Sequence, residues 1–327
     1  MFRSGDSLYS KALRSIAIAL VFASAAAYAQ TFPSRPVRLV APFATGGALD
    51  LIARAVGQKL SDGLGRPIIV DNKAGASGAI GSEFVARSAP DGYTLLLGAT
   101  TTHGINPALN PKLSYDPIKD FTPISLVATI PHVLVVHPDV PAKTVQEFVR
   151  LAKSRPGMTF GSAGHGSPHH LAGEMLKAMA QIELTHIPYK GSGPAMIDLM
   201  AGQIQLMSVE LTAATPYIKD SRMRPLAIAT AQRVAGVDLP TVAEAGYPGF
   251  EVTAWYAVFG PAGIPRAIVS LLNAEIVKGL AEPDLRERFR ALGATPVGST
   301  PAELGAHVRA ELARWTHVIK TAKISAE

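Results

Sequence analysis

Residues 37–60 have the sequence VRLVAPFATGGALDLIARAVGQKL, and this stretch decides the fold class. Its first six residues, 37–42, form an apolar extended run that predicts a buried strand. A turn with two glycines follows at 43–48. After the turn, apolar residues recur at the spacing of a helix face: Ile52, Ala55, Val56 and Leu60. A strand, a turn and an amphipathic helix in this order form the first part of a βαβ unit, which predicts a parallel α/β sheet.

The same alternation continues along most of the chain. Further strands are expected at 67–72, 93–98, 158–162, 184–189, 205–210 and 225–230. One helix is expected to end at 84–89, and others are expected at 145–153, 169–179, 195–201, 267–280, 283–292 and 302–320. We interpret 75–81 as a glycine-rich loop, and the proline-rich stretch at 107–123 as an irregular surface excursion. The chain therefore contains two α/β series.

Two long extended runs separate and follow the second series. The first is divided by Pro131 into runs at 124–130 and 133–137, and the second spans 250–259. Two such crossings predict an α/β protein of two lobes joined by two crossover strands, the architecture of a hinged binding protein. We expect residues 30–128 and 254–327 to form lobe 1, and residues 129–253 to form lobe 2.

Length and composition exclude several classes of protein. The chain has 327 residues, of which 48% are hydrophobic and 17% charged, which suits about two globular domains. It contains no cysteine, so disulfides, thiolate metal sites and a cysteine nucleophile are excluded. The net charge is only +6 and no block of five basic residues occurs, so we expect no nucleic-acid partner.

Residues 1–29 have the layout of a secretory signal peptide. An apolar run at 16–27 follows a basic start, which is formed by Arg3, Lys11 and Arg14. The small-x-small sequence at 27–29 then predicts cleavage after Ala29. The apolar run is shorter than the ~20 residues of a membrane span. We expect export to a bacterial periplasm, and the alternative is a buried or amphipathic N-terminal helix.

The turn after the first strand is a candidate anion-binding site. Backbone N–H groups at a helix N-terminus attract anions, and glycine lets a ligand approach the chain closely. The candidates in this turn are Phe43, Thr45, Gly46, Gly47 and Ala48. The alternative is an ordinary strand-to-helix turn in which Asp50 complements the helix dipole.

Short polar residues also follow three other predicted strands. Ser162 and Ser167 lie in the loop after the strand at 158–162, where Ser167 has the position of a helix N-cap and Pro168 follows it. Their hydroxyls are candidates for holding a carboxylate, and the alternative is simple capping. Ser77 lies in the glycine-rich loop after the strand at 67–72, and Thr100 and Thr101 follow the strand at 93–98. These residues are expected at carboxyl ends of strands, where open α/β sheets bind ligands.

A cluster of histidines raises the question of a metal or catalytic site. His165, His169 and His170 lie close together, with Glu174 four residues after His170. However, no HExxH motif occurs, and adjacent histidines on a helix point to different faces, so we expect no metal and no cofactor. The motifs GxSxG, GxGxxG and GxxxxGK[ST] are also missing from the sequence, and Ser167 so near two histidines rarely forms a catalytic pair. We therefore expect no catalytic residues.

Characteristic stretches occur along nearly the whole chain after residue 33. They include PSRPVRLVAPFATGG (33–47), APDGYTLLLG (89–98), YDPIKDFTPISLVA (115–128), SAGHGSPHHLAGE (162–174), HIPYKGSGPAMIDLMAGQ (186–203) and WYAVFGPAGIP (255–265). With these stretches the chain resembles the periplasmic solute-binding proteins of the tripartite tricarboxylate transporters, also called the Bug family.

The resemblance implies a fold and a function. The fold is the type II periplasmic-binding-protein fold, whose two lobes close on a ligand that is usually a carboxylate. The resemblance places Phe43, Gly46 and Gly47 in the family's first binding loop. It places Ser162, Ser167 and His170 in the second. We expect a monomer that captures a small organic carboxylate and delivers it to the membrane permease subunits of such a transporter. The alternative is a component that presents its ligand to a sensor, and a more distant one is a hydrolase.

The sequence departs from the family pattern at three places. Ala48-Leu49 replaces a glycine-threonine pair, Ala79 replaces an asparagine, and Val209-Glu210 replaces an aspartate-asparagine pair. Val209 and Glu210 are therefore included as ligand-binding candidates. The loss of polar groups predicts a preference for an acid on an aromatic or alkyl frame over citrate. Glu210 either points away from the cleft or pairs with a ligand amine or a protonated acid.

Overall fold

A computed structural model describes residues 32–189, 191–234, 236–291, 293–321 and 324. The expected signal peptide with its cleavage site lies outside these residues, as does the last residue of the helix expected at 283–292. Within the described part of the chain, no helix is both long enough and apolar enough to cross a membrane.

The first lobe is built on three parallel strands, β1 (Val37–Ala41), β2 (Ile68–Asn72) and β3 (Thr94–Ala99), with β1 in the middle. Its helices are α2 (Ala48–Leu64), α3 (Ala79–Ala86), α9 (Arg266–Ala281), α10 (Pro283–Ala291) and α11 (Pro301–Thr321). Leu39 packs with residues of α2 and α9, whereas its neighbour Val40 packs with residues of α3 and α11. Both faces of β1 are therefore buried, which explains why its sequence is apolar throughout.

The second lobe repeats this plan with β5 (Thr159–Ser162), β6 (Thr185–Pro188) and β7 (Leu206–Glu210), all parallel. One face is covered by α5 (Val145–Ser154) and α6 (Pro168–Ala180), and the other by α7 (Ser192–Met200) and α8 (Leu211–Lys219). Helix α8 was not predicted from the sequence. The antiparallel strand β8 (Arg224–Ile228) pairs with the long strand β4 (Phe121–Val136) at the edge of this sheet.

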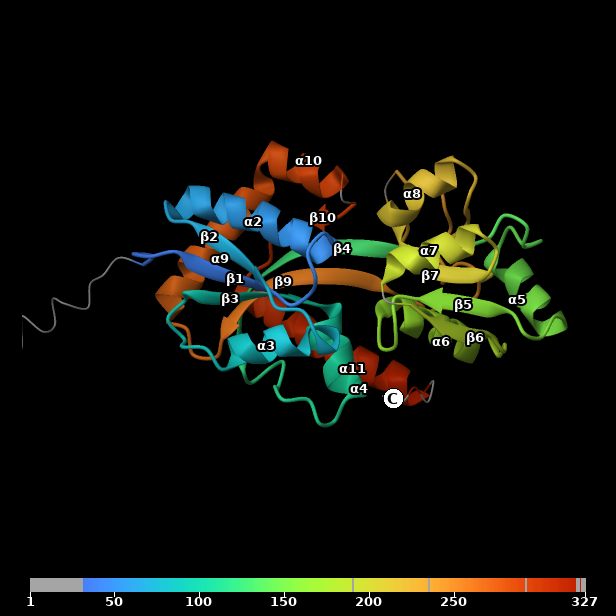
Figure 1. Cartoon of the computed structure of the whole chain (residues 1–327), viewed down its shortest axis with the longest axis horizontal. Coiled ribbons are helices and arrows are strands. Elements are labelled where there is room, and N and C mark those ends of the chain that lie inside the picture. The colour runs from blue at the N-terminus through green and yellow to red at the C-terminus, as the bar shows by residue number, and fades with distance from the viewer. Residues whose placement is uncertain (1–31, 190, 235, 292, 322–323, 325–327) are drawn as a thin grey trace, which may run out of the picture.

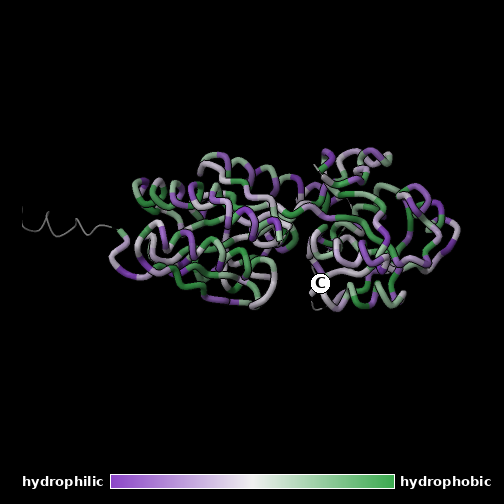
Figure 2. The backbone as a smooth tube through the Cα atoms, turned by 90° about the horizontal axis from the view of Figure 1, so that it is seen from above, coloured by the Kyte–Doolittle hydropathy of each residue, from purple (hydrophilic) through white to green (hydrophobic). Residues whose placement is uncertain are grey.

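Two long strands, β4 (Phe121–Val136) and β9 (Thr253–Pro261), run antiparallel between the lobes. Figure 2 shows the narrower region that they cross. The prediction of two separate runs around Pro131 is wrong, because β4 is continuous. It leaves β9 at Pro131 and joins β7 at His132, so the missing proline N–H falls at the junction of two ladders. The prediction of two α/β lobes joined by two crossover strands is confirmed.

Other differences lie in loops that contain more structure than expected. The loop expected at 75–81 contains a 3₁₀ turn (Ala76–Gly78), and α3 already begins at Ala79. The stretch before the proline-rich excursion forms a π-helical turn (Thr101–Ile105) that runs into α4 (Asn106–Leu109). The short strand β10 (Thr295–Pro296) pairs with β4. The π-helical turn depends on burial, because Thr102 and His103 are completely enclosed.

The C-terminal helix α11 contacts both lobes. Leu304 and Val308, near its start, belong to a core cluster of the first lobe. Trp315 and Ile319, near its end, pack in the core cluster of the second lobe. Figure 1 shows α11 passing beneath the crossover region toward the second lobe. The helix therefore connects the lobes in addition to β4 and β9.

Candidate ligand-binding site

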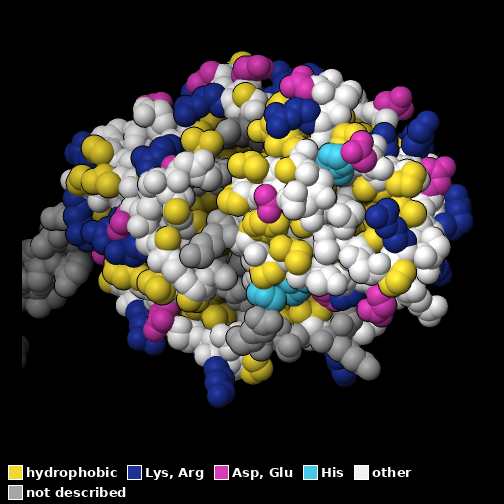
Figure 3. Space-filling view, turned by 45° about the vertical axis from the view of Figure 1, so that its right-hand side comes forward, with side chains coloured by type: hydrophobic (Ala, Val, Ile, Leu, Met, Phe, Trp, Pro, Cys, Tyr) yellow, Lys and Arg dark blue, Asp and Glu magenta, His cyan; other side chains and the backbone are white. Residues whose placement is uncertain are grey.

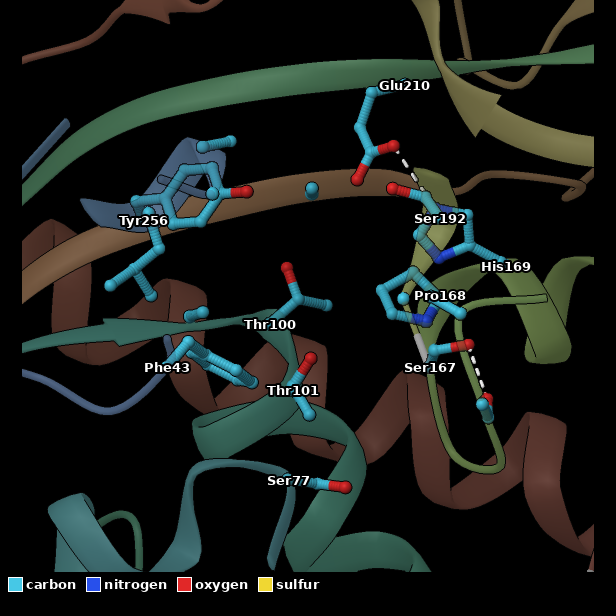
Figure 4. A pocket seen from close by; sticks show the side chains of 18 of the residues that line it. Phe43, Ser77, Thr100, Thr101, Ser167, Pro168, His169, Ser192, Glu210 and Tyr256 are labelled. Atoms are coloured by element: carbon cyan, nitrogen blue, oxygen red, sulfur yellow. Dashed lines mark hydrogen bonds and ion pairs between the residues drawn. The ribbon is translucent and has the colours of Figure 1, made fainter. Parts of the chain in front are cut away.

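A cavity of about 410 Å³ lies between the lobes (Figure 4). Its walls come from strand-to-helix loops of both lobes and from β9. The described residues that line it are Phe43, Ala44, Gly47, Ala48, Leu49, Ser77, Ala99, Thr100, Thr101, Ala163, Gly164, His165, Ser167, Pro168, His169, Gly191, Ser192, Glu210, Ala254, Trp255 and Tyr256. Most of these side chains are apolar or small, so an enclosed ligand meets polar groups at only a few points.

The first loop presents the N-terminus of α2 to the cavity. Gly47 is the N-cap, and no side chain caps the helix there. Asp50 is buried and structural, since it accepts hydrogen bonds from the Gly46 N–H, from Arg54 and from Asn72. Burial raises the pKa of Asp50, but these hydrogen bonds hold it below its ordinary value. The alternative interpretation of Asp50 as a first-turn acid therefore fits the structure.

Within this loop, the structure places the predicted residues unequally. Phe43, Gly47 and Ala48 line the cavity, whereas Thr45 and Gly46 do not. The Gly46 N–H is 3.0 Å from Asp50 Oδ2, so this amide is already used inside the loop. Leu49, which was not predicted from the sequence to contact the ligand, also lines the cavity.

The second loop presents the N-terminus of α6. Ser167 lines the cavity and caps the helix, because its Oγ accepts from the His170 N–H (3.2 Å) and donates to the Gly164 carbonyl (2.6 Å). Its hydroxyl proton is therefore occupied within the loop. The helix start was correctly predicted from Ser167 and Pro168.

Ser162 and His170 were predicted to contact the ligand, but neither lines the cavity. Ser162 is fully buried, with its Oγ 2.6 Å from His186 Nε2 and 3.0 Å from the Gly164 N–H. His170 Nδ1 accepts from the Gly166 N–H at 3.2 Å, and burial lowers the pKa of His170 to about 4. Both side chains hold the loop in place from behind.

Hydroxyl groups of the first lobe lie opposite this loop. Ser77, from the turn after β2, and Thr100 and Thr101, from the end of β3, all line the cavity. Thr100 Oγ1 accepts from the Trp255 N–H at 2.8 Å, which ties the loop to β9. Thr102 turns inward instead and bonds the backbone of Ala99.

Val209 and Glu210 occupy opposite faces of β7. Val209 is fully buried in the core beneath α7 and α8, so its assignment to the site is wrong. Glu210 faces the cavity, because successive strand residues alternate in direction. Its Oε2 lies 3.1 Å from His169 Nε2, and the side chain is 18% exposed. Burial raises the pKa of Glu210, but the neighbouring His169 lowers it well below the usual range.

Several lining residues escaped the sequence analysis. Gly191 and Ser192 form the N-terminus of α7, and the rule that selected the loop after 158–162 applies equally to the loop after 184–189. Tyr256 lies on β9, and Figure 4 shows its hydroxyl pointing into the space that Thr100 and Glu210 also face. Burial raises the pKa of Tyr256, so this hydroxyl keeps its proton. Only tertiary contact identifies Tyr256.

The electrostatics of the cavity favour an anion at the loop ends. The N-termini of α2, α6 and α7 all reach it, and the first backbone N–H groups of a helix have no partner within the helix. At α6, Pro168 has no N–H and Ser167 caps that of His170, which leaves the N–H of His169. None of the described lining residues is lysine or arginine. Positive and negative side chains are interspersed on the outer face in Figure 3. The backbone therefore supplies the attraction for an anion.

Two groups among the described residues are spaced so that they could hold a metal ion. One contains His165, His170 and His186, and the other His132, His169 and Glu210. In each group, one ligand atom per residue lies within 4.8 Å of the others.

Comparison of the sequence and the fold with known proteins identifies a family of transport receptors. Residues 52–324 match the family described as the tripartite tricarboxylate transporter family receptor. Protein BugT of Bordetella pertussis is 37% identical over 308 residues, which cover 93% of this chain and 94% of BugT. The structure of R. palustris Rpa4515 with adipate has a TM-score of 0.82 and 39% identity, covering 90% of this chain and 99% of that one.

A second solved structure, MatC (Rpa3494) from Rhodopseudomonas palustris with bound malate, has a TM-score of 0.79 and 37% identity. The match covers 88% of this chain and all of MatC. The resemblance noted in the sequence, and the type II periplasmic-binding-protein fold that it implies, are thereby confirmed.

Proposed function

Because this chain belongs to the receptor family of the tripartite tricarboxylate transporters, we propose that it captures a small organic carboxylate in the cavity between its lobes. It then delivers the ligand to the permease subunits of such a transporter. The observation that carries the proposal is the convergence of three helix N-termini, from α2, α6 and α7, on one cavity. A carboxylate is the kind of ligand that such free N–H groups bind.

The ligand is held from both lobes. We assign its carboxylate to the backbone N–H groups at Gly47 and at the start of α6, with the hydroxyls of Thr101 and Ser192 beside them. Contacts from two lobes favour a closed arrangement, since the ligand binds that state better than an open one. Small-angle scattering with saturating ligand is expected to show a smaller radius of gyration.

The cavity wall selects the body of the ligand. Phe43, Ala48, Leu49 and Trp255 supply apolar surface, which contributes about 25 cal/mol for each Å² of ligand buried. Rpa4515 with adipate and MatC with malate make linear dicarboxylates the first ligands to test. We propose that an acid on an alkyl or aromatic frame binds more tightly than citrate. Ala79 and Val209, two of the departures behind this preference, do not line the cavity.

The remaining parts of the proposal concern the export, the oligomeric state and the lobe boundaries of the chain. We propose export to the periplasm with cleavage after Ala29, action as a monomer, and lobe boundaries at 128/129 and 253/254. The chain is proposed to bind its ligand without transforming it, as receptors of its family do.

Calorimetry on the purified mature chain tests the function. The ligands are adipate, malate, benzoate and citrate, each titrated into the same protein. We expect saturable binding of at least one acid, and weaker binding of citrate than of adipate or benzoate. Binding of none of the four would count against the proposed ligand class, and tightest binding of citrate would overturn the preference for an apolar frame.

A further inference from the structure

We propose that His132, His169 and Glu210 bind one divalent transition-metal ion at the inner wall of the ligand cavity. The fitting class is a zinc-like ion held by two imidazoles and one carboxylate, with its open position directed toward the cavity. We further propose that the carboxylate of the ligand occupies this open position. The second statement rests on the proposed function, and the first does not.

The three side chains meet because of the tertiary structure. His132 on β4 lies directly opposite Glu210 on β7 in the antiparallel ladder. His169 is the second residue of α6, and its Nε2 lies 3.1 Å from Glu210 Oε2. One ligand atom from each residue lies within 4.8 Å of the other two. A tetrahedral zinc ion needs ligand atoms about 3.3–3.5 Å apart, so small side-chain movements are sufficient.

One buried nitrogen atom lacks a partner. His132 is completely buried, and its Nδ1 lies 3.2 Å from Ser208 Oγ. Its Nε2 has no hydrogen-bond partner in the described structure. In His169 the nitrogen that faces Glu210 is Nε2, and a metal ion between the two residues would replace their direct hydrogen bond. One imidazole nitrogen held by a neighbour while the other is left available is the usual arrangement of a metal-binding histidine. The unpaired Nε2 of His132 is therefore the atom that we assign to the metal.

The charge of Glu210 supports the same assignment. A carboxylate facing the cavity repels a carboxylate ligand, although three helix N-termini around the cavity favour an anion. A divalent ion beside Glu210 reverses this repulsion, because the ion and the carboxylate together carry a positive charge. The ligand would then be attracted from both ends of the cavity.

The other histidine group fits a metal less well. The rings of His170 and His186 stack, with centroids 4.1 Å apart and planes 22° apart. Stacked rings direct their in-plane lone pairs side by side rather than toward one point. His170 Nδ1 and His186 Nε2 are also engaged, by the Gly166 N–H and by Ser162 Oγ. This group therefore serves as the control.

Titration with Co²⁺ tests the proposal, because its visible spectrum reports coordination geometry. The mature chain is purified without a histidine tag and treated with a chelator. We expect uptake of one equivalent with a four- or five-coordinate spectrum. Glu210→Gln and His132→Phe should each weaken uptake at least tenfold, whereas His186→Phe, in the other histidine group and outside the cavity wall, should not. His132→Phe keeps a ring of similar volume in the buried site. Glu210→Gln provides an independent test if the His132→Phe variant misfolds. Thermal unfolding of each variant verifies that it is folded.

The possible outcomes separate the two statements. No uptake, a weak octahedral spectrum shared by all variants, or loss only in His186→Phe would overturn the metal site. If Co²⁺ binds as expected, saturating adipate should change its spectrum. An unchanged spectrum, with adipate binding proved by calorimetry, would overturn the coordination of the ligand alone. Co²⁺ uptake by a chain that binds none of the tested acids would leave the metal site standing while the proposed function fails.

Discussion

The indole N–H of Trp255 on β9 donates a 2.8 Å hydrogen bond to Glu311 Oε2 on α11. The same oxygen accepts from the Trp315 indole at 3.1 Å, and both carboxylate oxygens accept from Arg314. Trp255 lines the ligand cavity, and Trp315 packs in the core of the second lobe. One buried carboxylate thus joins a crossover strand, the C-terminal helix and the cavity wall.

Replacing Glu311 by alanine should therefore destabilise the whole protein. The change leaves two buried indole N–H groups without their acceptor and removes the carboxylate partner of the partly buried Arg314, which keeps its hydrogen bond to the Glu251 carbonyl. The expected cost is about 3 kcal/mol. Denaturant unfolding measures the difference. Glu287→Ala is the matched control, because Glu287 pairs with Arg290 on the exposed surface, where such pairs contribute about 0–1 kcal/mol. Equal losses in the two variants would contradict this role of Glu311.

A larger side chain at Gly47 should obstruct the cavity without disturbing the fold. The backbone there is extended, with φ −79°, and the only atom within 4 Å of an added Cβ is the Ala44 carbonyl oxygen at 3.9 Å. Gly47→Val is expected to weaken ligand binding by about 1–3 kcal/mol, measured by calorimetry with adipate.

The control for this change is Gly193→Val. Among the described residues, an added Cβ at Gly193 meets no atom within 4 Å, and Gly193 does not line the cavity although its neighbour Ser192 does. Its affinity should stay close to that of the unmodified chain. Parallel loss of affinity in both variants would indicate a general effect rather than obstruction at Gly47.

Ser167→Ala should affect stability more than affinity. The hydroxyl caps α6 and donates to the Gly164 carbonyl, so its loss should cost about 1 kcal/mol of unfolding free energy. Because its proton is already engaged, affinity for a carboxylate should change by less than this. Thermal unfolding without ligand and calorimetry with adipate give the two values, and a larger loss in affinity would show that Ser167 donates to the ligand.

The fully buried His103 should make stability fall with acidification. Burial lowers its pKa from 6.5 to about 3, so the unfolded chain binds a proton between these values and the folded chain does not. Stability therefore rises with pH over this range, by up to about 1.4 kcal/mol per pH unit from this residue.

His103→Phe tests this linkage, since the ring of His103 stacks on Phe259 at 4.0 Å between centroids and a phenyl ring preserves that contact. Unfolding free energies measured from pH 4 to 8 should fall less steeply for the variant below pH 6.5. Above pH 7 the two slopes should coincide. Identical slopes at low pH would contradict the buried, neutral state of His103.

Much of the fold and part of the site could be predicted from the sequence, because the signals are local. Periodicity predicted most strands and helices, and capping chemistry predicted the start of α6 at Ser167 and Pro168. The glycines of the first turn likewise predicted where α2 begins. The order of strands and helices determined the class of fold.

The tertiary structure decided which side chains share the cavity. Pro131 predicted a break in the strand. The strand β4 continues there because its partner changes from β9 at Pro131 to β7 at His132. Glu210 acquires its partners from residues that are 41 and 78 positions away, His169 and His132. Tyr256 and Trp255 enter the wall only because β9 crosses between the lobes. Residues close along the chain determine the hydrogen bonds within a helix or a turn. The charge around a side chain in the cavity, its burial and its hydrogen-bond partners depend instead on groups that come together only when the chain folds.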